Sequence, residues 1–591
     1  MTLVDKKLED IFRKQSLERA EYTKKILASS SPRKIIVSGP GTGKTYTFEE
    51  LLKLKNKNCL ALTFINNLVN KLKKKLDGYA KTCTFHKFCK ELLHKIPKTD
   101  LTDAFILYPK LETIIKSDSE ILTKASPKFS VSFRKIDLSN SNIGFFLRRS
   151  SYYDAVSFDD SVYRVMEYFR YNPGHIPQYD QIVVDEYQDF NKLEVEFLNM
   201  LSEKNPILIV GDDDQALYGK LKSASASFIR EKYNDPTYDH FDLPYCSRCT
   251  VVITEAVDDI IKQAKNQGKL KDRIDKKYMC YLPDKWEDSE KYPKIIHARC
   301  STQTHNTPFI ARYIENELDM LSAEEIKAAN KDADFTVLVA GSGHYLKQVQ
   351  DYFIKLNKYK LDFREEEAYR DSIKIIDGYL ILLREGEQSN LGWRILLEID
   401  HLRNVGDIIK NTEDVPAIKL CKILPDSYVK KHLLIVKLLN KLNSPEELVS
   451  DEVKQLETSI GIKIDKINEI LSSDIEKQAP EAEKNQEELS IVFTTYVGCK
   501  GLSAGFVFII GLDEGNLPGD NKAPSDIEVC NFIVALTRTI KKCYLISTKY
   551  IFTGKKAEPS IFINWIARKR LDYIWVDKAF FSKTKAVLTC Q

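Results

Sequence analysis

Long apolar runs are missing from this 591-residue sequence, and none approaches the roughly 18 residues that a helix needs to cross a bilayer. The first ten residues carry five charged side chains, so they lack the apolar core of a secretory signal. The twelve cysteines are scattered, which is typical of reduced thiols and not of a disulfide framework. We therefore expect a cytoplasmic protein that does not contact a membrane.

A strong excess of charge of either sign is also absent. Lys and Arg number 89 and Asp and Glu number 85, so the formal net charge is +4. This balance excludes a histone-like polycation, although a local basic groove is still compatible with it. Hydrophobic residues make up 43% of the chain and charged residues 29%, as in globular proteins. At about 150 residues per domain, the length predicts about four domains.

Short β-branched runs are each followed by a polar loop and then by a helical pattern. These runs are residues 35–37, 59–64, 182–184 and 207–210, and a second series begins near 335, 490 and 506. Strands that alternate with helices, with polar loops at their carboxyl ends, indicate doubly wound parallel sheets. Mixed polar segments from about 91 to 178 and helical patterns from about 393 to 488 interrupt the alternation. The predicted fold class is α/β.

The segment Ser38–Thr45 reads SGPGTGKT and lies between a predicted strand and a predicted helix. Its glycines allow backbone N–H groups to turn toward phosphates without an obstructing Cβ. Lys44 adds a positive charge at the β- and γ-phosphates, and the Thr45 hydroxyl is a ligand for Mg²⁺. The expected nucleotide contacts are Gly39, Gly41, Thr42, Gly43, Lys44, Thr45 and Tyr46.

A second motif, IVVDEYQD, ends another predicted strand in two adjacent carboxylates. Asp185 is placed to hold Mg²⁺, and Glu186 to orient and deprotonate the water that attacks the γ-phosphate. The two motifs together predict a nucleoside triphosphatase that uses Mg²⁺.

Closely spaced cysteines raise the alternative of a zinc or iron–sulfur site. Cys83, His86 and Cys89 form one group, and Cys246 with Cys249 forms another. Zinc sites usually combine two short-spaced ligand pairs, and neither group supplies two clean pairs. We therefore expect no such site.

Further motifs follow in a fixed order. They are TFINN (Thr63–Asn67), TFHKF (Thr84–Phe88), VGDDDQALYG (Val210–Gly219), LPYCSR (Leu243–Arg248), KGL (Lys500–Leu502), VALTRT (Val534–Thr539) and PSIF (Pro559–Phe562). With this order and spacing, most of the chain resembles superfamily 1 DNA helicases of the UvrD/Rep/PcrA type. The resemblance implies two RecA-like doubly wound parallel-sheet motor domains that clasp one ATP, each with a mainly helical insertion. From the breaks in the alternation of strands and helices, we expect the first motor domain at 1–90 and 179–245, its insertion at 91–178, the second motor domain at 246–392 and 489–591, and a small helical insertion with an acidic linker at 393–488.

The resemblance also assigns roles across the nucleotide. Gln215 would sense the γ-phosphate from the first motor domain, and Arg538 would reach it from the second as an arginine finger. With Lys44, Asp185 and Glu186 they complete the expected catalytic set. Tyr245 stands at the position that stacks on adenine. The arginine of the family's NYR motif falls on Cys246, and we expect Arg248, two residues on, to substitute for it.

Other motif positions depart from the family pattern. Glu21 lies near the place of the glutamine that reads adenine, and Gln15 lies further back. The arginine that often follows GKT is Tyr46, and the His and Glu of the HSAKGLE motif are Val497 and Ser503. These departures leave the base selectivity and the ribose contacts open.

A motor on a single strand needs a groove for the backbone and flat side chains on which bases stack. By resemblance, the DNA contacts are Thr63, Phe64, Asn66, Thr84, Phe85, His86, Tyr218 and Lys220. Core packing is the competing interpretation for Phe64, because it follows an apolar run. Lys220 stands where many relatives have Trp, so charge would replace stacking there.

The leading hypothesis is an ATP-driven helicase or translocase that moves 3′ to 5′ on single-stranded DNA or on DNA with a single-stranded tail. The alternative is a nucleotide-switched DNA-binding module that recruits a nuclease or repair protein and unwinds little. Action on RNA is a third hypothesis. A nuclease or a repair protein is the candidate partner.

Overall fold

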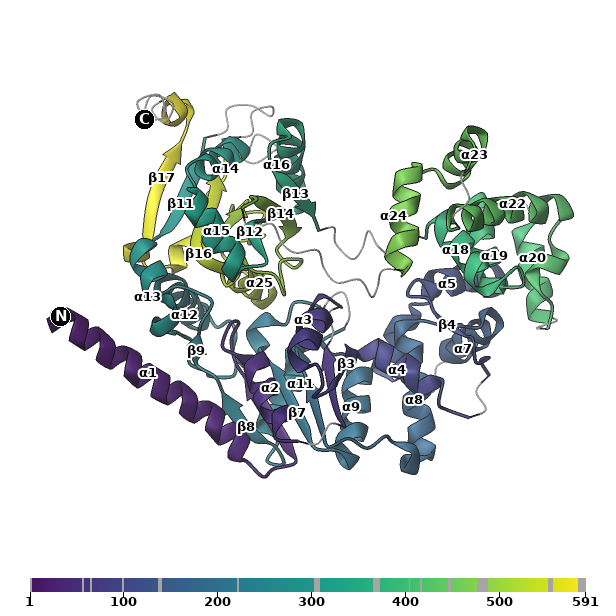
Figure 1. Cartoon of the computed structure of the whole chain (residues 1–591), viewed down its shortest axis with the longest axis horizontal. Coiled ribbons are helices and arrows are strands. Elements are labelled where there is room, and N and C mark those ends of the chain that lie inside the picture. The colour runs from purple at the N-terminus through teal and green to yellow at the C-terminus, as the bar shows by residue number, and fades with distance from the viewer. Residues whose placement is uncertain are drawn as a thin grey trace.

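In the computed structural model the chain forms two α/β lobes, one above the other in Figure 1, with a body of helices beside them. The described residues are 3–55, 58–63, 66–97, 100–136, 141–219, 223–301, 309–364, 373–402, 404–414, 417–444, 448–475, 487–550 and 556–582.

The lower lobe, called lobe 1, is built on a six-stranded sheet in the order β3-β2-β6-β7-β1-β8. All its strand pairs are parallel. Its strands are β1 (Arg33–Val37), β2 (Cys59–Thr63), β3 (Lys81–Thr84), β6 (Gln181–Val184), β7 (Ile207–Gly211) and β8 (Asp239–Asp242). Its helices are α1 (Leu3–Ala28), α2 (Lys44–Lys53), α3 (Asn66–Leu76), α4 (Phe85–Leu93), α9 (Lys192–Lys204) and α11 (Ala226–Asn234). The short 3₁₀ turns η2 (Tyr187–Asp189) and η3 (Asp213–Gln215) follow β6 and β7.

Both faces of this sheet are covered, which explains why its strands are continuously apolar. In β1, Ile35 and Val37 belong to the core on one face, and Ile36 to the core on the other, under α2 and α3. This alternation is the two-residue period of a strand. The predicted runs at 35–37, 182–184 and 207–210 are confirmed as central parallel strands.

The upper lobe, lobe 2, contains a seven-stranded parallel sheet in the order β13-β14-β12-β15-β16-β11-β17. Its strands are β11 (Ile295–Cys300), β12 (Phe335–Gly341), β13 (Lys360–Phe363), β14 (Ser490–Thr495), β15 (Ala504–Ile510), β16 (Thr539–Thr548) and β17 (Leu571–Val576). Its helices are α12 (Val251–Asn266), α13 (Leu282–Lys291), α14 (Phe309–Asp319), α15 (Ala323–Asp332), α16 (Gly343–Leu356), α25 (Asp526–Leu536) and α26 (Ile561–Trp565), with η4 at Arg568–Arg570. A small ladder joins β9 (Tyr245–Cys246) to β10 (Met279–Cys280). The two parallel sheets confirm the predicted fold class.

Helices dominate the two segments that interrupt the lobes. The first contains η1 (Pro173–His175), α5 (Leu111–Thr123), α6 (Phe129–Lys135), α7 (Ser141–Tyr153) and α8 (Phe158–Tyr171), with the short strands β4 (Ile106–Leu107) and β5 (Ala155–Val156). The second contains α18 (Ile375–Glu385), α19 (Asn390–Asp400), α20 (Val405–Asp414), α21 (Leu420–Ile423), α22 (Asp426–Leu442), α23 (Ser450–Ile460) and α24 (Ile464–Ile475). The expected boundary at 393 falls inside α19, and α18 packs against α19 and α22. The helical segment therefore begins at Ile375, because α18 shares its apolar core.

The two helical segments touch each other, as Figure 1 shows for α5 and α7 beside α18–α20. Ile381, Leu391 and Ile395 of the second segment are buried in the same core as residues of α5 and α7. At the interface, Lys110 of the first segment forms an ion pair of 2.8 Å with Asp377 of the second. The insertions are therefore one packed body in this structure.

A buried charge network lies at the centre of this interface. Asp118 of α5 accepts hydrogen bonds of 2.8 Å from the Nε atoms of Arg149 in α7 and Arg394 in α19. The side chains of Asp118 and Arg394 are 0% exposed. Arg149 also donates to the Thr412 hydroxyl and Arg394 to the Ser117 hydroxyl, both at 3.0 Å. Such a network is stable only when each charge keeps its partners.

We expect Arg394→Met to lower the free energy of unfolding by about 3–5 kcal/mol, because it leaves Asp118 buried with one fewer cation. Urea unfolding followed by circular dichroism measures the change. Arg148→Met is the matched control, since the Arg148 side chain is 65% exposed and its nearest carboxylate is 3.8 Å away. The control should change the stability by less than about 1 kcal/mol. Equal effects of the two substitutions would contradict a special role for the buried network.

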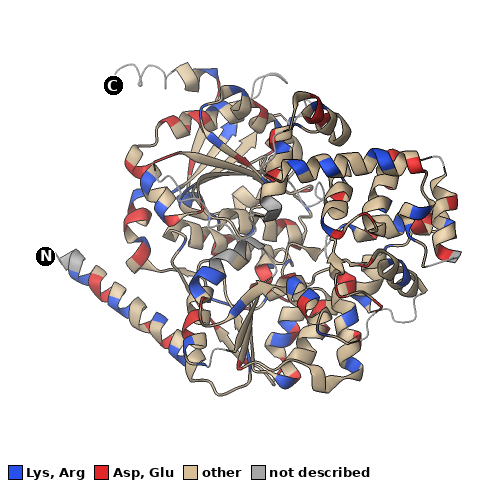
Figure 2. Cartoon of the chain, turned by 45° about the vertical axis from the view of Figure 1, so that its right-hand side comes forward, with Lys and Arg blue, Asp and Glu red and all other residues tan. Residues whose placement is uncertain are grey.

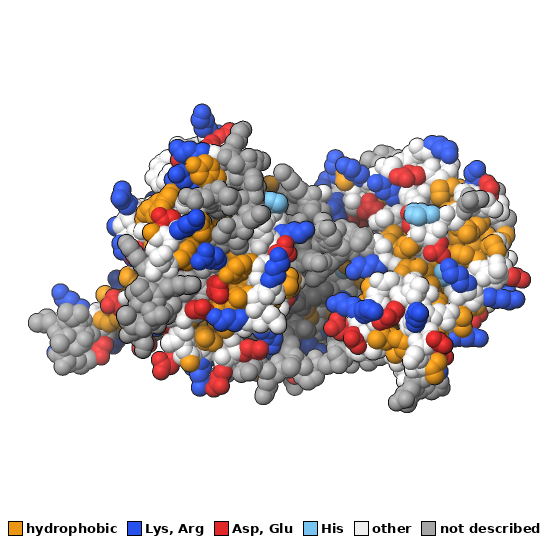
Figure 3. Space-filling view, turned by 90° about the horizontal axis from the view of Figure 1, so that it is seen from above, with side chains coloured by type: hydrophobic (Ala, Val, Ile, Leu, Met, Phe, Trp, Pro, Cys, Tyr) orange, Lys and Arg blue, Asp and Glu red, His pale blue; other side chains and the backbone are white. Residues whose placement is uncertain are grey.

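Charges of both signs are mixed over the surface. Figure 2 shows Lys and Arg interspersed with Asp and Glu along α1 and over the lobes and the insertions. The top face in Figure 3 has the same mixture among its described side chains. On these faces a nucleic acid would therefore be bound by individual Lys or Arg side chains and not by a continuous basic surface. Among the described helices, none combines the length and the apolarity that a membrane span requires.

Candidate nucleotide site at the seam of the two lobes

The glycine-rich loop joins β1 to α2 at the carboxyl edge of the lobe 1 sheet. Gly41 and Gly43 have φ angles of 74° and 94°, which favour glycine, and Gly43 is the N-cap of α2. Lys44 is the first residue of that helix, and its ammonium donates to the Ser38 carbonyl at 3.4 Å. The Thr42 hydroxyl donates to the Gly39 carbonyl at 2.9 Å. This is the strand, loop and helix geometry that binds phosphates at a helix N-terminus.

Lobe 2 covers one side of this loop. The Ser247 N–H donates to the Gly41 carbonyl at 2.9 Å, and the Tyr278 hydroxyl donates to the Pro40 carbonyl at 3.0 Å. A Cβ at Gly39 would lie 2.6 Å from the ring of Tyr278, and one at Gly41 would lie 2.5 Å from the Cβ of Arg248. The two lobes are therefore closed on the loop, and these glycines are needed for the close approach.

Asp185 and Glu186 follow β6 next to the loop, and both are buried. Burial, and then the Glu186 carboxylate, raise the pKa of Asp185 to about 7. Burial works against the charge of Glu186 as well, but Lys44 and Lys500 outweigh it and lower the pKa of Glu186. The paired carboxylates and the Thr45 hydroxyl are hard oxygen ligands that fit Mg²⁺. Glu186 itself has a positive φ of 55°, a conformation uncommon outside glycine.

Arg538 reaches from lobe 2 to lobe 1. Its Nη2 donates to the Oε1 atom of Gln215 at 3.2 Å, although the two residues are 323 positions apart in the sequence. The Gln215 amide also donates to Asp212 at 2.7 Å. Arg538 is held in its own lobe by the carbonyls of Val534 and Leu502, at 3.0 and 3.3 Å. The two residues expected at the γ-phosphate therefore meet at the seam.

Arg248 lies beside this pair. Its Nη1 is buried and has no hydrogen-bond partner among the residues that the structure describes. Burial, and then the charge of Arg248, lower the pKa of Arg538. Two guanidinium groups whose charges act on each other favour an anion between them. Cys246, where the resemblance put the arginine, instead directs its Sγ at the Pro40 carbonyl, 3.2 Å away.

The expected adenine contact at Tyr245 is corrected by the packing around it. Tyr245 is 4% exposed, and its ring meets Tyr22 and Tyr281 edge-on at centroid distances of 6.5 and 6.1 Å. Its hydroxyl donates to Glu18 of α1. A ring enclosed in this way presents no open face to a base. Tyr46, by contrast, is 53% exposed at the start of α2.

Helix α1 contacts lobe 2 on the same side of the loop. The Gln15 side chain accepts from the Leu282 N–H at 2.8 Å and donates to the Cys280 carbonyl at 3.4 Å. Arg19 donates to the Ser247 hydroxyl at 2.8 Å and lies 4.3 Å from the centroid of Tyr281. These side chains thus join α1 to lobe 2.

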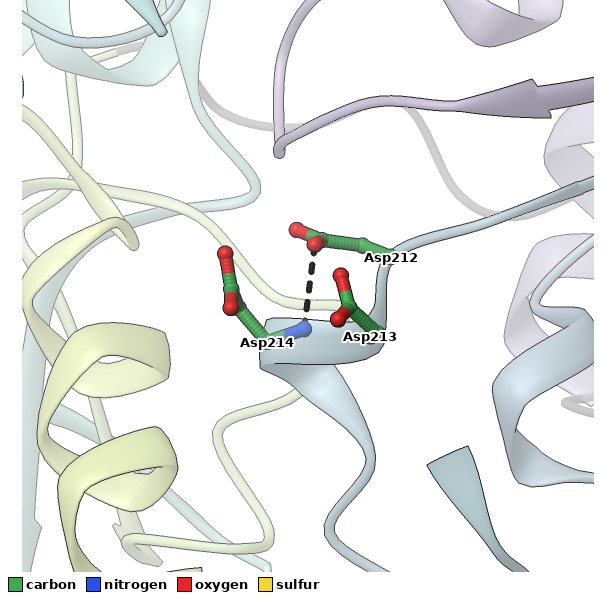
Figure 4. A group of neighbouring side chains, drawn as sticks. All are labelled: Asp212, Asp213 and Asp214. Atoms are coloured by element: carbon green, nitrogen blue, oxygen red, sulfur yellow. Dashed lines mark hydrogen bonds between the residues drawn. The ribbon is translucent and has the colours of Figure 1, made fainter. Parts of the chain in front are cut away.

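Three consecutive aspartates, Asp212, Asp213 and Asp214, come close enough together to hold a metal ion (Figure 4). Lys276 already lies among them, with its Nζ 2.9, 2.6 and 2.8 Å from their carboxylates. Arg273 adds an ion pair of 2.8 Å with Asp214. Although burial opposes its charge, these carboxylates raise the pKa of Lys276. Lys276 and Arg273 therefore neutralise the aspartates, and their ion pairs join lobe 1 to the segment that follows α12.

The expected DNA contacts divide into several groups. Thr63 and Thr84 end β2 and β3, at the same edge of the sheet as the glycine-rich loop. Thr84 caps α4 by accepting from the Lys87 N–H at 3.3 Å, and His86 lies 3.2 Å from Glu194. Phe64, Lys220 and the side chain of Asn66 lie outside the described residues.

Phe85 and Tyr218 have different surroundings from those that the resemblance implied. Phe85 is 0% exposed and packs edge-on against Phe190 and Phe197, with centroid distances of 5.2 and 5.6 Å. A ring buried in the core has no face for a base, so we remove Phe85 from the DNA contacts. Tyr218 is half-buried, and its ring centroid lies 5.4 Å from the Lys500 ammonium.

Two contributors to the seam were not predicted from the sequence. Lys500 was noted only as part of the KGL motif, yet its ammonium lies among Asp189, Glu186 and Gln215. Tyr278 lies in no motif, and no local pattern places its ring on the glycine-rich loop. The place of Lys500 in the KGL motif was a signal that could have led to its prediction. No signal in the sequence pointed to Tyr278.

Comparison with known proteins agrees with this geometry. A family model described as an AAA domain matches residues 23–220. The ATP-dependent DNA helicase PcrA of Leuconostoc citreum is 23% identical over 492 residues, covering 72% of this chain and 62% of that protein. PcrA of Staphylococcus aureus strain MRSA252 is 21% identical, covering 91% of this chain and 84% of that protein. The ATP-dependent DNA helicase Rep of Buchnera aphidicola subsp. Schizaphis graminum is 23% identical, covering 83% and 87%.

The matches with PcrA of Staphylococcus aureus and with Rep cover enough of the chain to include residues of both lobes. Over most of its length the chain is thus similar to superfamily 1 helicases of the UvrD/Rep/PcrA type.

Proposed function

We propose that this chain is a cytoplasmic ATP-dependent helicase or translocase that moves 3′ to 5′ on single-stranded DNA. The hydrogen bond between Arg538 and Gln215 is the observation that carries the proposal. It brings an arginine of one lobe to the γ-phosphate sensor of the other, beside Glu186 and the glycine-rich loop. Nucleotide at this seam would contact both lobes, so that binding and hydrolysis change the distance between them.

Each residue of the site has a role in this proposal. Lys44 and the loop amides hold the phosphates, and Glu186 accepts a proton from the attacking water. Gln215 orients the γ-phosphate, while Arg538 and Arg248 stabilise the charge that develops on it. Thr45 and Asp185 would hold Mg²⁺, which neutralises phosphate charge when it is bound.

The proposed DNA contacts follow from the edge of the lobe 1 sheet. Thr63 and Thr84 end neighbouring strands, and His86 is the second residue of α4 beside them. Thr63 is 0% exposed, so the half-buried Thr84 hydroxyl and His86 imidazole are the groups in this row that suit phosphate contacts. With Phe85 in the core, base stacking is left to Tyr218 and to Phe64, and Lys220 contributes charge. Because the surface charges are mixed, we expect fewer phosphate contacts than in a strongly basic groove.

A strand-displacement assay tests the proposal. The chain is given ATP and a labelled duplex that carries either a 3′ or a 5′ single-stranded tail. We expect displacement from the 3′-tailed duplex and ATP hydrolysis that single-stranded DNA stimulates, since translocation brings the motor to the duplex junction. Single-stranded RNA of the same sequence serves as the competitor. Displacement from the 5′-tailed duplex alone would contradict the direction, and stimulation by RNA alone would contradict the substrate.

The alternative function is a nucleotide-switched clamp on DNA that recruits a nuclease or repair protein. The substituted positions Val497 and Ser503 favour it. The complete set of hydrolytic residues counts against it, because a switch has little need of an arginine finger and a general base. DNA-dependent hydrolysis without displacement from either duplex would favour the clamp.

A further inference from the structure

Lys500 joins three parts of the proposed catalytic site from the opposite lobe. It follows β14 in lobe 2, and its side chain is 1% exposed. The ammonium donates to both carboxylate oxygens of Asp189, at 2.8 and 2.6 Å, and to the Gln215 carbonyl at 2.6 Å. Its Nζ is also 3.9 Å from the Oε2 atom of Glu186. An ammonium has three N–H donors, so these three bonds use all of them on lobe 1.

Both segments that Lys500 contacts carry a side chain proposed to face the γ-phosphate. Asp189 ends η2, the turn that begins after Glu186, and its N–H donates to the Glu186 carbonyl at 3.0 Å. Gln188 of the same turn donates to the Glu186 carboxylate at 2.6 Å. Gln215 ends η3. One cation therefore ties the turn that holds the general base to the turn that holds the phosphate sensor.

Arg538 makes fewer hydrogen bonds to lobe 1 than Lys500 does. Among the residues that the structure describes, its guanidinium makes one hydrogen bond to lobe 1, to Gln215, and its other bonds are to residues of its own lobe. Arg538 can thus turn toward a phosphate without breaking a set of bonds across the seam. If Lys500 leaves lobe 1, the buried Asp189 carboxylate and the buried Gln215 carbonyl lose their hydrogen bonds to the ammonium at the same time. Leaving two such buried groups without that partner costs free energy.

We propose that Lys500 is a positioning residue that reports closure of the seam: when the lobes meet, its ammonium fixes η2 and η3 and thereby aligns Glu186 and Gln215. This inference rests on the proposed ATPase function and adds to it a residue that acts through others. Opening of the lobes would withdraw the cation and release both turns at once. Hydrolysis would then be confined to the closed state.

The test compares Lys500→Met and Lys500→Arg with the wild-type chain in DNA-stimulated ATP hydrolysis. We expect Lys500→Met to lower kcat about 10²-fold, because misplacement of reacting groups by about 1 Å has an effect of this size. KM for ATP should change less than about threefold, since Lys500 does not hold the phosphates. Lys500→Arg should recover part of the lost kcat, because a guanidinium can still bond Asp189. Lys522→Met, at an exposed lysine of the same lobe, is the matched control and should leave both constants unchanged.

A second readout does not depend on turnover. A donor and an acceptor dye attached at the exposed positions Glu203 in lobe 1 and Ala579 in lobe 2 report the distance between the lobes. In the absence of nucleotide, Lys500→Met should lengthen or broaden this distance, and Lys522→Met should not.

The outcomes separate the two proposals. Wild-type kcat and an unchanged distance in Lys500→Met would overturn the role of Lys500, while the proposed function would stand. A parallel loss of kcat and of affinity, not rescued by Lys500→Arg, would also overturn it in favour of a folding role. If the wild-type chain hydrolyses no ATP, the proposed function falls, and Lys500 loses its role in hydrolysis with it.

Discussion

Glu186→Gln is expected to bind ATP and single-stranded DNA normally and to hydrolyse ATP about 10²–10⁴-fold more slowly than the wild-type chain. The substitution keeps the size of the side chain and its hydrogen bond from Gln188. It removes the carboxylate that we propose as the acceptor of the proton from the attacking water, and loss of a general base has an effect of this size. Single-turnover hydrolysis and equilibrium binding of a fluorescent ATP analogue measure the two properties separately.

Lys44→Ala is the companion control, because it removes the cation of the glycine-rich loop and should weaken ATP binding itself. A motor needs repeated hydrolysis, so Glu186→Gln should displace no strand from a tailed duplex. A nucleotide-switched clamp would keep its DNA-dependent recruitment of a partner in the same variant. Hydrolysis at the wild-type rate in Glu186→Gln would exclude this residue as the base.

Arg538→Ala is expected to lower kcat by about 10³-fold or more, with a smaller effect on the affinity for ATP. An arginine finger stabilises charge that is present in the transition state, and removal of one in phosphoryl transfer has this magnitude. The seam contact with Gln215 places the guanidinium where such a role is feasible. Steady-state hydrolysis at saturating DNA measures the effect.

Arg570→Ala provides the matched control for Arg538. Arg570 is an arginine of lobe 2 that bonds Asp259 at 2.7 Å, away from the seam. Its loss should leave kcat unchanged. If Arg538→Ala and Arg570→Ala behave alike, Arg538 contributes no charge to the reaction, and Arg248 becomes the candidate finger, since its Nη1 is buried without a partner in the described part of the chain.

Local patterns predicted the backbone at the carboxyl edge of the lobe 1 sheet well. Short apolar runs became central strands because both faces of the sheet are covered, and Ser38–Thr45 became a loop and helix start because Gly41 and Gly43 take positive φ angles. The same reasoning failed for side-chain environments. Phe85 and Tyr245 were assigned to ligands from their motif positions, but neighbouring aromatic rings enclose both. Motifs specify backbone geometry, whereas the exposure of a ring depends on distant residues.

Residues adjacent in the chain were thus enough to predict the glycine-rich loop, the paired carboxylates and the parallel α/β class, since each depends on hydrogen bonds and periodicity within a few residues. Contacts between distant segments could not be obtained in this way. Arg538 and Lys500 each bond a residue of lobe 1 that is more than 280 positions away in the sequence. The ion pairs of Lys276 with the three aspartates likewise depend on the tertiary fold, because no local pattern predicts them. The joining of the two insertions through Asp118 and Arg394 is of the same kind. Such pairs form because burial makes a charge without a partner costly, and the closed fold determines which partner is within reach.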